Sequence, residues 1–280
     1  MTESNLSPIA DVEAERTVLA LDTSTAALAC ALVHGGRVLG SIQSMAERNH
    51  SVLTVSHVKT LLDEHGVTAD KLDGIAVGQG PGSYTGMRIA VTLGKTLAWV
   101  WKKPLVGISS LEALAFGAFR AEGSKPSGGV KDKGPRWFVP IMDARRGQVY
   151  TALFAAEESG EWGRLAQDGN RLMADWVDRL AQLARENERP ALICITGDLT
   201  VHEAQAQRLG ELLRDSGVDC RLVPFDMEGE ALAELGLRRL NAGESDEVHA
   251  FIPNYTQLTE AEVNLRARQQ AAAAEGGSGK

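Results

Sequence analysis

The stretch that decides the fold is residues 17–33, which read TVLALDTSTAALACALV. An apolar run leads into the polar turn Asp-Thr-Ser-Thr at 22–25, and a second apolar run follows it. Apolar runs of this length that are bounded by turn residues predict two antiparallel strands. A His-Gly-Gly turn at 34–36 leads to a third strand over 38–42. The sequence therefore predicts an antiparallel meander at the start of the ordered chain.

The same pattern returns in the second half, where residues 137–154 read WFVPIMDARRGQVYTALF. Each copy has a strand, an acidic turn and a returning strand, and helices and a buried strand follow. Such a repeat predicts a duplicated α/β fold of two related domains, with mixed sheets flanked by helices. We place the junction near Pro104. The expected parts are a disordered N-terminal tail (1–16), a first domain (17–104), a second, degenerate domain (105–250), a C-terminal segment (251–268) and a disordered tail (269–280).

Composition excludes several classes of protein. The 280 residues include 29 Lys and Arg against 37 Asp and Glu, a formal charge of −8, and 44% are hydrophobic, which excludes a disordered or fibrous chain. A negative charge argues against a protein that grips nucleic acid by its own field. The three cysteines are scattered without a CxxC motif, as in a reducing compartment. With neither a signal sequence nor a long apolar run, we expect a cytoplasmic protein that contacts no membrane.

Two predicted helices, over 49–65 and 86–101, have unusual faces. Apolar residues cover about half of the first helix, more than a one-sided surface helix needs. The second carries a stripe of small residues at i+4 spacing, which lets another backbone approach closely. This stripe belongs either to a partner interface or to the core of the domain. Trp99 lies among cations on the polar side, as in an interface hot spot, or it packs under the second domain.

Three features could carry chemistry. The glycine-rich loop 78–86 joins a strand to a helix, but it matches neither the P-loop nor GxGxxG, so a structural turn is favoured over a phosphate cradle. Asp22 and Asp143 end equivalent strands, where each either holds Mg²⁺ through water or forms an Asx turn. The turn is favoured. The six histidines lack zinc-ligand spacing, so no metal site is predicted.

Four motifs together resemble the bacterial TsaB (YeaZ) family. They are LALDTST at 19–25, RNHS at 48–51, GQGPGSYTGMR at 78–88 and DARRGQVY at 143–150. The similarity spans about residues 17 to 260, and the segment GPGSYTG is its most specific part. The motif residues singled out are Asp22, Thr23, Ser24, Gly80, Pro81, Gly82, Ser83, Thr85, Arg88, Asp143 and Arg145.

This resemblance implies an actin/Hsp70-like (ASKHA) fold and a role in making N6-threonylcarbamoyladenosine at position 37 of tRNA. It implies a non-catalytic scaffold that pairs with the catalytic paralogue TsaD and recruits the ATPase TsaE. Residues 110–117 read SLEALAFG where the catalytic paralogue carries a metal-binding HxxxH helix, so we expect no enzyme activity from this chain alone. No cofactor is expected, with ATP or ADP considered only at a joint with a partner. Contact with tRNA is expected only through the complex.

The resemblance also implies where the partner binds. The first two helices of the first domain would form a four-helix bundle with the equivalent helices of TsaD. The expected interface residues are Val52, Val55, Val58, Leu62, Gly86, Ala90, Gly94, Ala98 and Trp99. One departure is Tyr255-Thr256-Gln257, where the family usually has an arginine after the tyrosine and a hydrophobic residue. Two alternatives stay open: an ATP-dependent kinase or hydrolase of the same fold that uses Asp22 and Asp143, and a homodimeric interaction protein.

Overall fold

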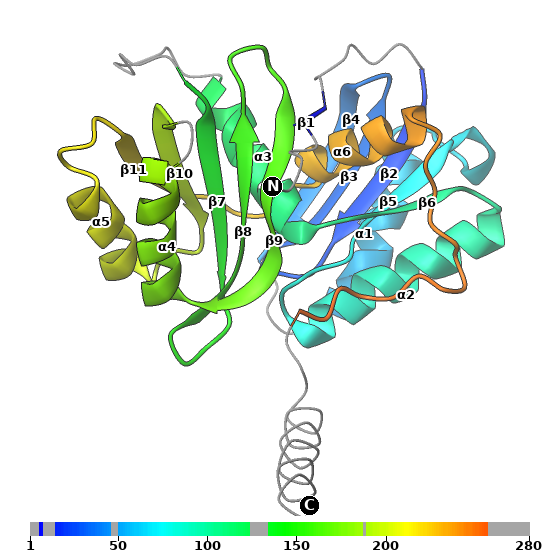
Figure 1. Ribbon diagram of the computed structural model, residues 1–280. Helices are drawn as coiled ribbons and strands as arrows, with labels where there is room; N and C mark the ends of the chain where they lie inside the picture. Colours follow the sequence, from blue (N-terminus) through cyan, green and yellow to red (C-terminus); the bar gives the residue numbers. More distant parts are fainter. Residues whose placement is uncertain (1–5, 8–14, 46–49, 124–133, 187–188, 257–280) are drawn as a thin grey trace, which may run out of the picture.

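The computed structural model describes residues 6–7, 15–45, 50–123, 134–186 and 189–256. Its strands form two sheets that stand side by side (Figure 1). The first sheet has the order β4-β3-β2-β5-β6, made of β2 (Thr17–Asp22), β3 (Leu28–His34), β4 (Arg37–Ser44), β5 (Gly74–Gly78) and β6 (Leu105–Ile108). The second has the order β1-β9-β8-β7-β10-β11, made of β1 (Leu6–Ser7), β7 (Arg136–Asp143), β8 (Gln148–Ala156), β9 (Trp162–Leu172), β10 (Leu192–Gly197) and β11 (Asp219–Pro224).

The two sheets are built alike. In the first, β2, β3 and β4 form the predicted antiparallel meander, whereas β5 and β6 add to it in parallel. In the second, β7, β8 and β9 are antiparallel, whereas β10 and β11 are parallel to β7. The two orders match strand for strand, with β1 as an addition to the second sheet. The predicted duplicated α/β fold with mixed sheets is therefore confirmed.

Helices cover the outer faces of both sheets and fill the space between them (Figure 1). They are α1 (His50–Glu64), α2 (Tyr84–Trp101), α3 (Ser110–Gly123), α4 (Met173–Glu186), α5 (Glu203–Leu212) and α6 (Gly229–Asn241), with a short 3₁₀ turn at Ala69–Lys71. Helices α1 and α2 pack on the first sheet from outside, and α4 and α5 lie on the outer side of the second. Helix α6 packs on the first sheet and α3 on the second, and the two helices contact each other.

These layers define two lobes. The first lobe is the first sheet with α1, α2 and α6, and the second lobe is the second sheet with α3, α4 and α5. One apolar core joins them, since it contains residues of both sheets and of both inner helices, among them Ala20, Phe116, Phe138, Phe154 and Leu237. Burial of so many apolar side chains in one cluster stabilises the contact between the lobes as well as each lobe.

The predicted domain boundary at residue 104 is wrong. Strand β6 pairs in parallel with β5, so the first sheet extends to Ile108. Helix α6, which lies inside the predicted second domain of residues 105–250, packs on β2, β3 and β5 of the first sheet. The predicted disorder of residues 1–16 is also wrong at two places, because Leu6–Ser7 pair with β9 and Arg16 Nη1 donates to Leu240 O. The tail at 269–280 lies outside the described residues.

Besides β1, two further strands were not predicted. Strand β9 alternates buried or partly buried with exposed positions along its first half, but its polar residues resemble those of a loop. Its end includes Arg171 and Leu172, so α4 begins at Met173. Strand β11 is a short partly buried edge strand that pairs with β10 alone. In both, pairing with a neighbouring strand outweighs a weak local preference.

Candidate functional site

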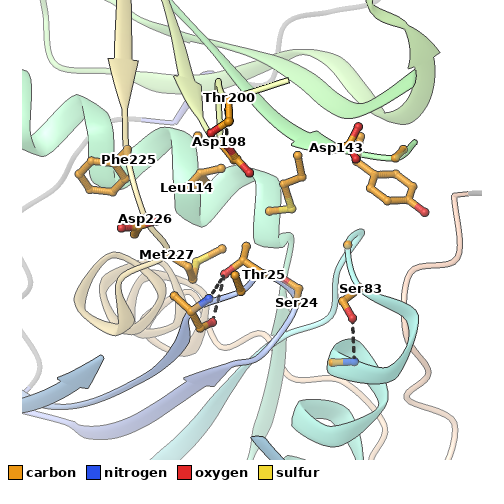
Figure 2. A pocket seen from close by; sticks show the side chains of 18 of the residues that line it. Ser24, Thr25, Ser83, Leu114, Asp143, Asp198, Thr200, Phe225, Asp226 and Met227 are labelled. Atoms are coloured by element: carbon orange, nitrogen blue, oxygen red, sulfur yellow. Dashed lines mark hydrogen bonds between the residues drawn. The ribbon is translucent and has the colours of Figure 1, made fainter. Parts of the chain in front are cut away.

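A large cleft opens between the lobes where the predicted motifs meet (Figure 2). Its volume is about 2240 Å³, and the turn after β2, the loop before α2, the β7–β8 turn and the loop after β10 line it. Residues of the resembled motifs that line it are Ser24, Gly82, Ser83, Thr85, Asp143 and Arg145. Those outside its lining are Asp22, Thr23, Gly80, Pro81 and Arg88. The fold thus collects these four turns, together with the segment 224–228 that leads from β11 to α6, around one space.

Asp22 is a buried structural residue and does not face this cleft. Its Oδ1 accepts a hydrogen bond from the Ser24 N–H at 2.6 Å, which makes an Asx turn, and its Oδ2 accepts one from Ser110 Oγ at 2.6 Å. Ser110 Oγ in turn accepts from the Gly80 N–H at 3.0 Å. Burial raises the pKa of the carboxyl group, while the hydrogen bonds from Ser110 and Ser24 oppose that shift. The favoured turn interpretation is therefore confirmed for Asp22.

Close packing explains the glycines around Asp22. A Cβ on Gly78 would lie 1.7 Å from Asp22 Oδ2, and one on Gly86 would lie 1.8 Å from the Thr23 carbonyl oxygen. The Ser83 N–H donates to Ser24 O at 2.7 Å, and Thr23 Oγ1 donates to Gly86 O at 2.6 Å. The glycine-rich loop is thus a structural turn packed against the first turn, as predicted. Ser83 also caps α2, since its Oγ accepts from the Gly86 N–H.

Asp143 occupies the equivalent place in the second lobe and lies at the cleft. Its Oδ1 accepts a hydrogen bond from the Arg145 N–H at 3.1 Å and lies 2.9 Å from His202 Nε2. The predicted Asx turn is confirmed here too, but the carboxylate is one-third exposed. Arg145 and Arg146 follow with left-handed backbones, φ 65° and 53°, in a turn where Asn and Gly are usual. His202 is buried beside this turn. It is 59 residues from Asp143 in the sequence, so no sequence motif predicts that the two side chains meet.

The small-residue stripe of α2 belongs to the core, so its expected role in a partner interface is wrong. Gly86, Ala90, Gly94 and Ala98 are all buried within the chain. A Cβ on Gly94 would lie 2.2 Å from Val77 Cγ2, because β5 runs directly beneath the helix. The stripe lets α2 approach this strand, which is the second of the two roles left open.

The predicted interface residues of α1 divide in the same way. Val58 is 4% exposed and packs in the core of the first lobe, so its predicted contact with a partner is also wrong. Leu62 is partly buried against that core, whereas Val55 is 55% exposed. The predicted cap Asn49 and the side chain of Val52 lie outside the described part of the chain.

The exposed side of the helix pair carries large apolar side chains. Trp99 is 64% exposed and Val100 is 58% exposed, so Trp99 does not pack under the second lobe. Arg88, near the start of α2, lies 5.3 Å from the centre of the Tyr84 ring and donates to its hydroxyl. We call Val55, Trp99 and Val100 the exposed helix face. All three are large apolar side chains that stay more than half exposed in the described part of the chain.

The sequence is similar to proteins of one bacterial family. The chain is 36% identical to the tRNA threonylcarbamoyladenosine biosynthesis protein TsaB of Bacillus subtilis, over 88% of its own length and 96% of that protein. The chain belongs to the TsaB (YeaZ) family. It is 32% identical to the Escherichia coli TsaB protein, over 52% of this chain and 58% of that protein. This family places it in tRNA threonylcarbamoyladenosine biosynthesis.

Two further similarities extend the family assignment. Residues 37–195 match the family model described as TsaD, tRNA N6-adenosine threonylcarbamoyltransferase. YeaZ from Pseudomonas aeruginosa has a similar structure, with a TM-score of 0.63, 26% identity and coverage of 86% of this chain and 99% of that one. With its two matching mixed sheets flanked by helices, the chain has the expected actin/Hsp70-like duplicated fold.

Two features are absent from the described residues. No helix among them is long and apolar enough to cross a membrane. In the same parts of the chain, no three His, Cys, Asp or Glu side chains lie close enough together to hold a metal ion.

Proposed function

We propose that this TsaB-family chain is a non-catalytic scaffold subunit of the tRNA N6-threonylcarbamoyladenosine transferase complex. It pairs with a TsaD-type catalytic paralogue and recruits a TsaE-type ATPase. The observation that carries the proposal is the exposed helix face, where Val55, Trp99 and Val100 are each more than half exposed. Tryptophan is one of the residues enriched among interface hot spots.

The buried stripe supports this proposal indirectly. Because Gly94 and the other small residues let α2 lie close to β5, the helix is anchored along its length. A partner that binds the opposite side then meets a preformed surface and pays little conformational entropy on binding. The partner contact therefore depends on the exposed helix face, and not on the stripe that the sequence suggested.

Two features support a subunit without catalysis of its own. Helix α3, Ser110–Gly123, contains no histidine, and most of its first half is buried. Asp22, the first aspartate that a kinase or hydrolase of this fold would use, is engaged by Ser24 and Ser110 and lies outside the cleft lining. The charge of −8 supports contact with tRNA only through a partner with a basic surface.

The test compares substitutions on the exposed helix face with a matched surface control. Trp99→Ala is expected to weaken binding to the catalytic paralogue by about thirtyfold, about 2 kcal/mol, and to slow tRNA modification by the mixture. Val100→Ser should act in the same direction, whereas Val201→Ser, at an equally exposed valine of the second lobe, should have no effect. Binding is measured by calorimetry and folding by circular dichroism.

Three results would overturn the proposal. One is modification at the full rate by the catalytic paralogue alone. Another is unchanged binding by both face variants. The third is micromolar binding of ATP with Mg²⁺ to this chain alone, which would favour the kinase or hydrolase alternative. The mass in solution, with and without the paralogue, separates hetero-pairing from the homodimer alternative.

A further inference from the structure

The last described residues, 246–256, contain a turn at 248–250 and otherwise lack regular secondary structure. They run along α2, and we call them the C-terminal strap (Figure 1). Its first residue pairs with the edge of the first sheet, since the Asp246 N–H donates to Leu105 O at 2.7 Å. Phe251 is 7% exposed and packs in the core of the first lobe. Lys95 Nζ of α2 donates to His249 O at 3.1 Å and to Phe251 O at 2.7 Å. The strap is thus anchored to the first lobe at several points.

At Asn254 the same strap reaches the second lobe. The Asn254 backbone N–H donates to Gln79 O of the first lobe at 2.7 Å. Its side-chain Nδ2 donates to Asp168 Oδ2, on β9 of the second lobe, at 3.1 Å. One residue therefore holds both lobes, through its backbone on one side and its side chain on the other.

A β-bulge places Asp168 for this contact. On β8, Thr151 and Leu153 are two residues apart, whereas their partners on β9, Gly169 and Ala166, are three apart. One extra residue in a strand leaves the ladder and redirects a side chain, and such bulges are typical of functional positions. The Asp168 carboxylate, whose side chain is 10% exposed, is thereby available to Asn254.

Asp168 also belongs to a polar network that extends to α3. It pairs with Arg164, and Arg164 Nη2 donates to Glu112 Oε2 of α3 at 2.9 Å. Glu112 Oε1 accepts from Trp162 Nε1 at 3.3 Å. A carboxylate with several donors is held in a fixed place, so the hydrogen bond from Asn254 connects the strap to a rigid part of the second lobe.

We propose that the C-terminal strap is a latch between the lobes, closed by the hydrogen bond from Asn254 to Asp168, and that it sets the opening of the cleft. The inner helices α3 and α6 form one connection between the lobes. The latch adds a second contact through the strap and β9, and the pair of Asp168 with Arg164 joins it to Glu112 of α3. The ring of the next residue, Tyr255, lies 5.6 Å from the ring of Tyr84 at a tilt of 36°, and Tyr84 lines the cleft. Two connections prevent a rotation that one alone would allow. This inference does not depend on the proposed partner.

The test measures the distance between the lobes in the full chain. Spin labels are placed at Thr92→Cys on α2 and Glu211→Cys on α5, both exposed, and Cys220→Ser removes the partly exposed native thiol. Asn254→Ala is expected to broaden the distance distribution measured by pulsed electron resonance. Asn254→Asp should broaden it further, because two carboxylates would then repel each other.

Two more variants complete the design. Lys95→Met frees the strap from α2 without touching Asp168 and should also broaden the distribution. Asn170→Ala is the matched control, because Asn170 Nδ2 donates to Gln148 Oε1 at 3.1 Å within the second sheet. It should leave the distribution unchanged.

Hydrogen exchange gives an independent measurement. Peptides from β9 and from the start of α2 are expected to exchange about tenfold faster in Asn254→Ala, while thermal melting shows a folded protein. The proposal is overturned if Asn254→Ala leaves both the distance distribution and the exchange unchanged. It is equally overturned if the control changes them as much.

Discussion

The substitution Gly94→Ala tests directly whether the small-residue stripe of α2 is core. A Cβ built on Gly94 lies 2.2 Å from Val77 Cγ2, well inside van der Waals contact, so the helix or β5 must move. Overpacking of this kind costs about 1–3 kcal/mol. Alanine offsets part of that cost because it favours a helix over glycine by about 1 kcal/mol. We expect a net loss of up to about 2 kcal/mol in the free energy of unfolding.

Urea unfolding followed by circular dichroism measures this loss, and two further variants give it meaning. Gly210→Ala in α5 is the control, because a Cβ there meets its nearest atom, Cys220 Cβ, at an ordinary 3.6 Å. It should be neutral or stabilise by up to about 1 kcal/mol. Val77→Ala alone should cost about 2 kcal/mol, but combined with Gly94→Ala the two losses should not add, with a coupling of about 1 kcal/mol or more.

The opposite pattern would refute the reasoning. If Gly94→Ala were as stable as Gly210→Ala and showed no coupling to Val77→Ala, the helix would not rest on β5 as described. If such a stable variant also failed to bind the catalytic paralogue, the stripe would be a partner interface after all.

Three other predictions follow from the buried groups near the motifs. Asp22→Asn should flatten the pH dependence of stability. Because the folded-state pKa of Asp22 is raised, wild-type stability falls as pH rises from 3.8 through that higher value. Urea unfolding at a series of pH values measures this, and a steeper loss of stability in the variant than in the wild type would contradict it. Gly78→Ala should lower the free energy of unfolding by about 3 kcal/mol, because its Cβ would displace the Asp22 carboxylate. In the same assay, a urea midpoint equal to that of the wild type would count against the described packing. Burial raises the pKa of the Cys30 thiol to about 12 and the pKa of the Cys220 thiol to about 11. The folded protein should therefore react slowly with a thiol reagent at pH 8, whereas the unfolded chain should react rapidly. Fast labelling of Cys30 in the folded state would contradict its burial.

Local patterns were sufficient where neighbours in sequence are neighbours in space. The Asx turns at Asp22 and Asp143 depend on contacts between residues two apart, and each strand of the meander pairs with the next strand along the chain. The four motifs are likewise continuous in the sequence, so they indicate the family without the structure. Strand β9 was missed because its polar residues become a strand only when β8 pairs with them.

Contacts between distant residues could not be read in this way. The bond from Ser110 to Asp22 joins residues 88 apart, and that from Asn254 to Asp168 joins residues 86 apart. Ser110 opens a helix as many serines do, so nothing in its local sequence marks it as the partner of a buried carboxylate. The same holds for His202 beside Asp143, which are 59 residues apart.

The amino-acid sequence by itself determined the repeated strand, turn and strand units, the family and the presence of two unusual helices. Only the tertiary structure decided which side of those helices is available. Periodicity shows that one face of a helix differs from another, but it does not show which face the sheet covers, because burial depends on how closely a distant strand approaches. Val77 lies beneath Gly94, which leaves Trp99 on the outside, and the small residues that suggested a partner interface are core.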